Sequence, residues 1–176
     1  GEVVRQGTTD KLLAELALGI ASYDDVRTGN GRMAIEFLDS SVVRLTEHSK
    51  IIIDDFVYDP DPNKSKLALS MASGTARFIT GRLAGIKKEN IFIKTPSATI
   101  GIRGTDFTTT VDELGRSLVI LLPDSMGNAS GEISVTTWSG TEILDQPFQA
   151  TMVSTFESRP TKAVVLGNLT LELIDN

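Results

Sequence analysis

The sequence predicts an all-β fold, either a β-sandwich or a β-roll or solenoid-like stack of many short strands. Apolar and polar residues alternate with period two through most of the 176 residues, and this is the side-chain period of a half-buried strand. Gly, Asp, Asn and Pro interrupt the alternating runs about every ten residues, as turns between strands do. A chain of this length can bury a core without covalent cross-links, and this one has no Cys.

The clearest expected strand begins after Asn30-Gly31, a pair typical of hairpin turns because both residues tolerate positive φ. In that strand Met33, Ile35 and Phe37 share the apolar face. Another turn is expected at 39–40, and later strands follow the same logic, with the run 118–122 apolar enough to be buried. The runs expected as strands are 32–37, 43–46, 51–53, 67–71, 76–78, 91–93, 107–111, 118–122, 133–137, 150–156, 163–166 and 169–174.

One segment departs from this pattern and predicts a short N-terminal helix. In TTDKLLAELALG, Thr9 or Asp10 could cap the first turn, and Leu12, Leu13 and Leu16 could share a face. Gly19 would end the helix. The fold class therefore includes one short helix as an option.

Composition narrows the classes of partner. The net charge is −6, with 17 basic residues scattered among 23 acidic ones, whereas nucleic-acid binding needs clustered Lys and Arg. No apolar run approaches the roughly 20 residues that a membrane helix requires. We therefore expect no nucleic-acid partner and no membrane span within this chain.

The inventory of chemical groups predicts no catalytic, cofactor-binding or metal site. Nucleophile-and-base catalysis normally uses His, Cys or a tuned carboxylate pair, and the chain has one His and no Cys. His48 lies between two expected strands and is interpreted as an exposed turn residue. The acidic loop from Asp54 to Asp61 lacks the spacing of a calcium loop, so we expect a solvated loop, with an adventitious cation site as the alternative.

The most informative string is TPSATIGIRGT, from Thr95 to Thr105. Gly101 and Gly104 flank Arg103, which allows the backbone to bend or to pass close to its neighbours. The favoured interpretation makes Arg103 an internal clamp on an acid or carbonyl of the fold, because a guanidinium forks well onto such groups. The alternative makes it an anchor for a partner's carboxylate. We expect the set Thr95, Pro96, Gly101, Arg103, Gly104 and Thr105 to be a structural motif.

Two aromatic residues are candidate interface residues. Trp138 and Phe148 border the turn-rich stretch WSGTEILDQPF, and exposed aromatic side chains often mark protein interfaces. Burial of both in the core is nevertheless the favoured interpretation, because the chain has only ten aromatic residues to fill its interior.

With these residues in view, the chain resembles the FecR family of extracytoplasmic domains. The resemblance includes GEVVRQG at the start, YDDVRTG at 23–29 and RMAIEFLDSSVVRL at 32–45. Its strongest part is IKTPSATIGIRGTDFTTTV at 93–111, where Thr95-Pro96 and Gly101-x-Arg103-Gly104-Thr105 occupy the places of the family motif. We therefore expect one domain over 1–176, with a family-like core at about 1–122 and an additional loop and C-terminal β extension at 123–176.

The resemblance implies a non-enzymatic, protein-binding or sensory module in the periplasm or at the cell surface. Its expected partner is another protein or copies of itself, and neither a cofactor nor a small-molecule ligand is expected. The alternative is a structural subunit of a surface assembly, a filament or a phage particle that reuses the fold. An enzyme is not expected, since the sequence offers no acid and base pair.

Overall fold

The computed structural model describes residues 1–8, 11–15, 18–37, 40–57, 66–80 and 91–167, and these residues form β-strands and no helix. The all-β prediction is confirmed. The fifteen strands are β1 (Glu2–Val4), β2 (Lys11–Leu13), β3 (Asp25–Arg27), β4 (Met33–Glu36), β5 (Val42–Leu45), β6 (Lys50–Val57), β7 (Lys66–Ile79), β8 (Ile91–Lys94), β9 (Thr99–Arg103), β10 (Asp106–Val111), β11 (Ser117–Leu121), β12 (Glu132–Thr137), β13 (Gly140–Leu144), β14 (Gln149–Val153) and β15 (Val164–Val165). Over the same residues, nothing helical has the length and apolar character that a bilayer crossing needs.

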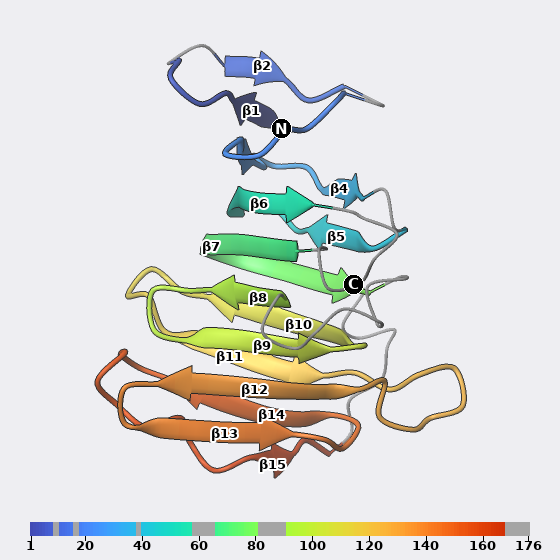
Figure 1. The fold of residues 1–176 in the computed structure, drawn as a ribbon, viewed down its shortest axis with the longest axis vertical. Helices are drawn as coiled ribbons and strands as arrows, with labels where there is room; N and C mark the ends of the chain where they lie inside the picture. The colour runs from blue at the N-terminus through green and yellow to red at the C-terminus, as the bar shows by residue number, and fades with distance from the viewer. Residues whose placement is uncertain (9–10, 16–17, 38–39, 58–65, 81–90, 168–176) are drawn as a thin grey trace.

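The strands form two layers, which we call sheet A and sheet B. Sheet A runs β2-β1-β3-β6-β7-β8-β9-β12-β13, and sheet B runs β4-β5-β7-β10-β11-β14-β15. The pairs are antiparallel except for β7 with β8. Successive strands descend along the long axis of the molecule from the N-terminal end to β13 and β15 (Figure 1). The result is a stacked sandwich, as the patterning predicted.

Strand β7 belongs to both sheets. Its first part pairs with β6 and β8 in sheet A, and from Gly74 onward it pairs with β10 in sheet B. Gly74 has φ of 91°, and the side chain of Ser49 occupies the space where a Cβ atom would lie. Ser49 Oγ accepts a hydrogen bond from the Thr75 N–H at 3.0 Å. A glycine is therefore required where the strand changes sheets.

The core lies between the two layers. The inward positions of β10 are Phe107, Thr109 and Val111, all buried, as their alternation predicted. Phe107 is paired in register with Phe78 of β7, and their rings stack with centroids 5.0 Å apart. Such aromatic pairs contribute about 0.5–1.5 kcal/mol beyond the area that they bury.

The predicted N-terminal helix is wrong where the structure describes that segment. Residues 11–13 form strand β2, which pairs antiparallel with β1. Leu12 and Leu13 are exposed, so the apolar face that a helix would have buried finds no core to pack against. Backbone pairing at the open edge of sheet A decides the structure of this short segment, because a short helix without packing is marginal.

The predicted hairpin turn at Asn30-Gly31 is also wrong. Strands β3 and β4 on either side of it do not pair: β3 pairs with β1 and β6 in sheet A, and β4 pairs with β5 in sheet B. The polar turn residues instead form the connection between the two layers. The alternation after it is confirmed, since Ile35 and Phe37 are buried and Ala34 and Glu36 are exposed.

Candidate functional site

The Thr95-Pro96 part of the motif connects the two sheets. Thr95 Oγ1 accepts the N–H of Ala98 at 3.0 Å within the tight β8–β9 turn. In sheet B, the Ser117 hydroxyl at the start of β11 lies 2.7 Å from Thr95 Oγ1 and 2.6 Å from Ser97 Oγ. All three hydroxyl groups are buried, and buried polar groups with partners fix a unique packing. We call these three side chains the hydroxyl bridge.

The Gly-Arg-Gly-Thr part forms the crossing from sheet A to sheet B. Strand β9 ends at Arg103, Gly104 has φ of 54°, and β10 begins at Asp106. The Thr105 carbonyl accepts hydrogen bonds from the N–H and hydroxyl of Thr80, at 3.0 and 2.7 Å. At Gly101 the close neighbour is Ser134 of β12, its partner in register. The backbone of this segment therefore has tight neighbours on both sides.

The Arg103 side chain does not show the contacts expected of a clamp. It is exposed at the outer end of β9, and across the described ranges it forms neither a hydrogen bond nor an ion pair. The internal clamp predicted for Arg103 is thus not found there. Glycines and hydroxyl groups of the motif make the connections instead.

The predicted surface residues take different places. His48 is exposed in the turn before β6, with φ of 53°, as expected of a turn residue. Of the acidic loop, the structure describes the side chain of Asp54, which pairs with the Ser70 hydroxyl; Asp59 and Asp61 lie outside the described residues. The described residues include no cluster of His, Cys, Asp or Glu side chains that could hold a metal ion.

Trp138 and Phe148 are not brought together. Trp138 lies at the β12–β13 turn and is 79% exposed, so burial in the core is ruled out for it. Its ring neighbour is Phe156, with centroids 6.1 Å apart. Phe148 is half-buried in the turn after β13. Trp138 precedes β13, and the five residues of this strand span about 17 Å, so the two aromatic side chains lie at opposite ends of it.

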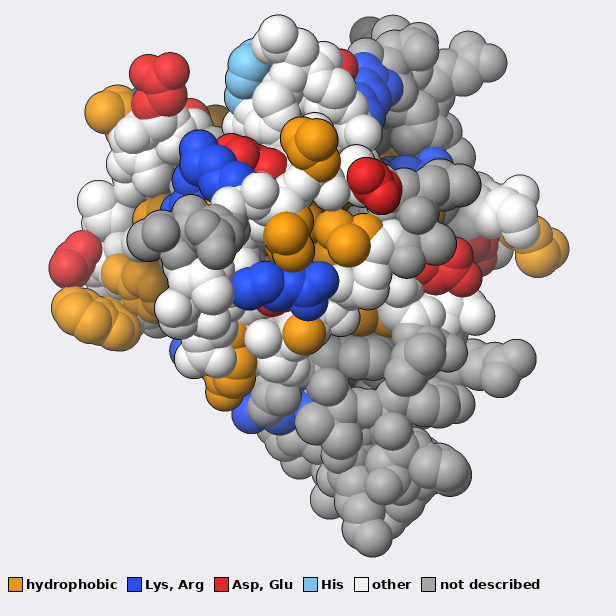
Figure 2. All heavy atoms as spheres, turned by 90° about the horizontal axis from the view of Figure 1, so that it is seen from above, with side chains coloured by type: hydrophobic (Ala, Val, Ile, Leu, Met, Phe, Trp, Pro, Cys, Tyr) orange, Lys and Arg blue, Asp and Glu red, His pale blue; other side chains and the backbone are white. Residues whose placement is uncertain are grey.

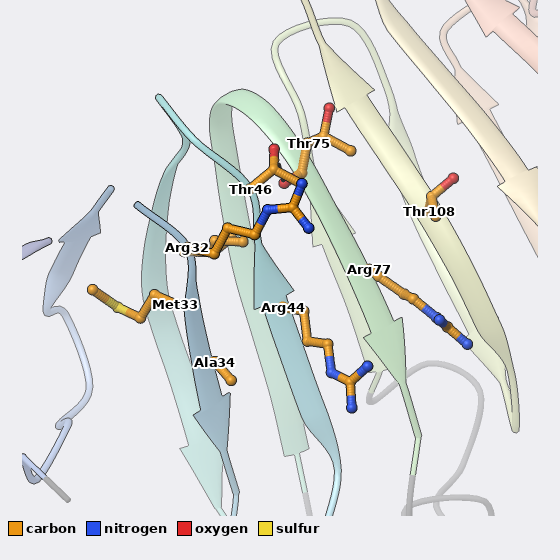
Figure 3. Close-up of a pocket in the computed structure, with 9 residues that line it drawn as sticks. Arg32, Met33, Ala34, Arg44, Thr46, Thr75, Arg77 and Thr108 are labelled. Carbon is orange, nitrogen blue, oxygen red and sulfur yellow. Dashed lines mark hydrogen bonds between the residues drawn. The ribbon is translucent and has the colours of Figure 1, made fainter. Parts of the chain in front are cut away.

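The outer face of sheet B carries a groove that the sequence did not reveal. It has a volume of about 430 Å³ and lies across β4, β5, β7 and β10. Three arginines line it, Arg32, Arg44 and Arg77, together with Thr46, Thr75 and Thr108 (Figure 3). We call this surface the arginine groove.

Two of the three guanidinium groups of the arginine groove face a carboxylate. Arg77 binds Asp106 through two hydrogen bonds of 2.9 and 2.7 Å, and only 14% and 17% of these side chains are exposed. Arg32 Nε donates to Glu47 at 3.0 Å. The pKa of Glu47 is lowered by a hydrogen bond from its own backbone and by the hydrogen bond from Arg32, so this carboxylate is charged at neutral pH.

Arg44 is different from the other two. It is exposed on β5, and within the described part of the chain its side chain has no ion-pair or hydrogen-bond partner. In register it stands directly opposite Arg77, and Figure 3 shows the two side chains on neighbouring strands. Like charges in this relation repel and destabilise the sheet.

The sequence contained a partial signal for this groove. Arg32, Arg44 and Arg77 each occupy a polar position of an alternating strand, which predicts that they point outward. Their meeting depends on the pairing of β5 with the second half of β7, and this register is a tertiary property. Figure 2 shows the N-terminal end of the molecule, where acidic, basic and hydrophobic side chains of the described residues lie intermixed.

Comparison with known proteins gives a family and a fold. The model of the family described as FecR protein matches residues 24–124, which is more than half of the chain. A search of curated proteins finds no match.

Among solved structures, the chain is similar to two crystal structures, at 1.65 and 2.50 Å resolution, of a protein from Parabacteroides distasonis ATCC 8503 named "putative anti-sigma factor". In both cases the TM-score is 0.55 at 14% sequence identity, over 77% of this chain and 57% of that one. The chain thus matches a little over half the length of these neighbours, and the similarity is one of fold.

Proposed function

Because the chain belongs to the FecR family, we propose that it is a non-enzymatic protein-binding module of a sensory system and works outside the cytoplasm. The family membership carries this proposal. The matched residues 24–124 include all four strands that form the arginine groove, so the groove is part of the family region. Trp138 and Phe156 lie outside that region.

The chemistry of the arginine groove favours binding over catalysis. Its charged groups are guanidinium groups, which stay protonated at physiological pH and cannot act as general bases. The two nearby carboxylates, Glu47 and Asp106, are already engaged by arginines. A surface of this kind can hold an anionic group in place but has no group ready to transfer a proton.

The neighbouring Parabacteroides protein supports the signalling part of the proposal through its name. Proteins that transmit a signal across an envelope need a folded part that contacts another protein. A stacked sandwich with two broad outer faces provides such surfaces.

In-cell photo-crosslinking tests this proposal. A photoreactive amino acid would replace Arg44 on sheet B, Arg103 on sheet A or Trp138 at the β12–β13 turn, each in the full-length gene product in its own host. We expect the protein in the extracytoplasmic fraction, with a cross-link to a different protein from at least one position.

Recovery in the cytoplasmic fraction would contradict the proposed location. Cross-links between copies alone would contradict a sensory module and favour a structural subunit. The absence of cross-links from all three positions would contradict protein binding through any of these surfaces.

A further inference from the structure

The arginine groove has the chemistry to recognise a specific class of partner, and we infer that it binds a carboxylate-rich segment of another protein, a stretch of several Asp or Glu residues. This inference rests on the proposed function, protein binding, and adds the site and the chemistry of the partner. The charged lining of the groove, the register of its arginines and its dimensions support it.

The charged lining of the groove has the opposite sign to the chain. The charged side chains that line it are the guanidinium groups of Arg32, Arg44 and Arg77, and Arg44 has no ion pair within the described residues. The whole chain, by contrast, carries a net charge of −6. A local cationic surface on an acidic protein attracts anionic groups to that surface alone, because charges farther than about 8–10 Å are screened in physiological salt.

The register leaves Arg44 beside a like charge and without an ion pair of its own within the described residues. Arg44 lies directly opposite Arg77 on an antiparallel strand, and like charges so placed destabilise a sheet. Asp106 engages Arg77 from the far side, on β10. A carboxylate that entered the groove beside Arg44 would offset the repulsion and gain charge-assisted hydrogen bonds.

The neutral lining of the groove suits carboxylates and peptide groups. Thr46, Thr75 and Thr108 contribute hydroxyl groups, which can donate to a carboxylate oxygen or accept from a peptide N–H. The Thr75 hydroxyl lies 3.0 Å from that of Thr110 on β10. Met33 and Ala34 supply an apolar side for the methylene groups of Glu. The groove thus combines cationic, hydroxyl and apolar surface.

The dimensions favour a peptide over a single small anion. The groove crosses four strands, and neighbouring strands lie about 4.8 Å apart, so it is about 14 Å wide. An extended chain covers about 3.3 Å per residue, and four or five residues would therefore span it. A nucleic acid, the other polyanion, would bring many phosphates against a protein of strongly negative net charge.

A binding measurement with defined peptides tests the inference. The purified chain would be titrated into a fluorescein-labelled hexaglutamate peptide and, as a control of equal length, a labelled hexaglutamine peptide, with anisotropy as the readout. We expect binding of hexaglutamate only, weakened at least fivefold between 50 and 300 mM NaCl because the contacts are electrostatic.

Arg103→Gln is the matched control for Arg44→Gln. Both arginines are exposed strand residues, both lack an ion pair within the described ranges, and both substitutions remove one positive charge. They lie on opposite sheets. We expect Arg44→Gln to weaken hexaglutamate binding about 5- to 10-fold and Arg103→Gln to change it less than twofold.

Equal binding of hexaglutamine, or equal weakening by the two substitutions, would overturn the inference. Complete competition by 10 mM sodium sulfate with no effect of peptide length would also overturn it, because the groove would then be a small-anion site. If in-cell cross-links to a partner come from Arg103 or Trp138 and not from Arg44, the groove assignment fails while protein binding stands.

Discussion

The family motif at 95–105 and the arginine groove lie in the same sandwich and differ in burial and in charge. The motif is built from buried hydroxyl groups and glycines whose neighbours are the fold itself. The groove is built from arginines on an outer sheet face, one of them exposed and opposite a like charge. The recognisable sequence string therefore makes contacts within the fold, and the less conspicuous residues form the surface for which we propose binding.

The largest effect is expected where the extension packs against the motif. A Cβ atom added at Gly131 would overlap the backbone carbonyl oxygens of Arg103 and Gly104, and backbone cannot move aside as a flexible side chain does. Gly131→Ala should lower the free energy of unfolding by about 3 kcal/mol, measured by urea denaturation. Gly29→Ala is the control, because nothing lies within 4 Å of the added atom. Equal stability of the two variants would contradict the tight packing described here.

The second effect tests the hydroxyl bridge. Ser117→Ala removes the group that contacts both Thr95 and Ser97, and it leaves two buried hydroxyl groups with fewer partners. We expect a loss of about 2 kcal/mol in the free energy of unfolding, with hexaglutamate affinity unchanged. Ser125→Ala, at an exposed turn position, should leave stability within about 0.5 kcal/mol of the parent. A Ser117→Ala variant as stable as Ser125→Ala would refute the bridge.

The third effect is pH-dependent and concerns an ion pair away from both regions. Asp25 accepts two hydrogen bonds from Arg27, at 3.0 and 2.7 Å, and lies 3.4 Å from Lys50. Burial raises the pKa of Asp25, but the hydrogen bonds and positive charges of Arg27 and Lys50 lower it by more. The pKa therefore lies below its ordinary value of 3.8. Its stabilisation is therefore present above about pH 4 and is lost as the pH falls through the lowered pKa.

Asp25→Asn tests this assignment. At pH 7 the variant should be less stable by about 1 kcal/mol, and near pH 2 the difference from the parent should disappear, as followed by thermal unfolding across the pH range. A difference that is constant with pH would mean that the ionised carboxylate is not what stabilises this part of sheet A.

The smallest effect on stability is expected at the two matched arginines. Arg44→Gln removes the repulsion from Arg77 and should raise the free energy of unfolding by about 0.5 kcal/mol. Arg103→Gln, which removes no contact within the described ranges, should change it by less than that. Thermal unfolding of both variants at 20 mM NaCl gives the comparison. A large loss of stability in Arg103→Gln would restore the clamp that the sequence suggested.

Sequence reasoning identified ten of the fifteen described strands but not their assignment to sheets. It did not predict strands β1, β2, β3, β9 and β13. The alternation at 33–37 and 43–46 gave both faces correctly, because period two directly encodes which side chains are buried. The runs 67–71 and 76–78 were expected as separate strands, and they are parts of β7. The glycine between them marks a change of sheet rather than a turn, and only the packing of Ser49 against Gly74 shows why.

The arginine groove could not be predicted, because it also depends on how the strands pair. The motif residues are contiguous, so the sequence alone could single them out, although the contact expected of Arg103 was not found. Arg44 and Arg77 are far apart in the sequence and meet through the register of β5 with β7. A register follows from the whole set of pairings, which local patterning does not contain. The segment at 11–13 shows the same limit, since Leu12 and Leu13 fitted a helix until edge pairing was known.

The division between an architectural motif and a binding groove is tested most directly by measuring stability and hexaglutamate affinity on the same two variants, Ser117→Ala and Arg44→Gln. We expect a double dissociation. Ser117→Ala should lose about 2 kcal/mol of stability and keep its affinity, whereas Arg44→Gln should lose no stability, gaining about 0.5 kcal/mol, and should lose affinity about 5- to 10-fold. A result in which Ser117→Ala weakens binding while it remains fully folded, or in which Arg44→Gln binds as the parent does, would contradict the division between an architectural motif and a binding groove.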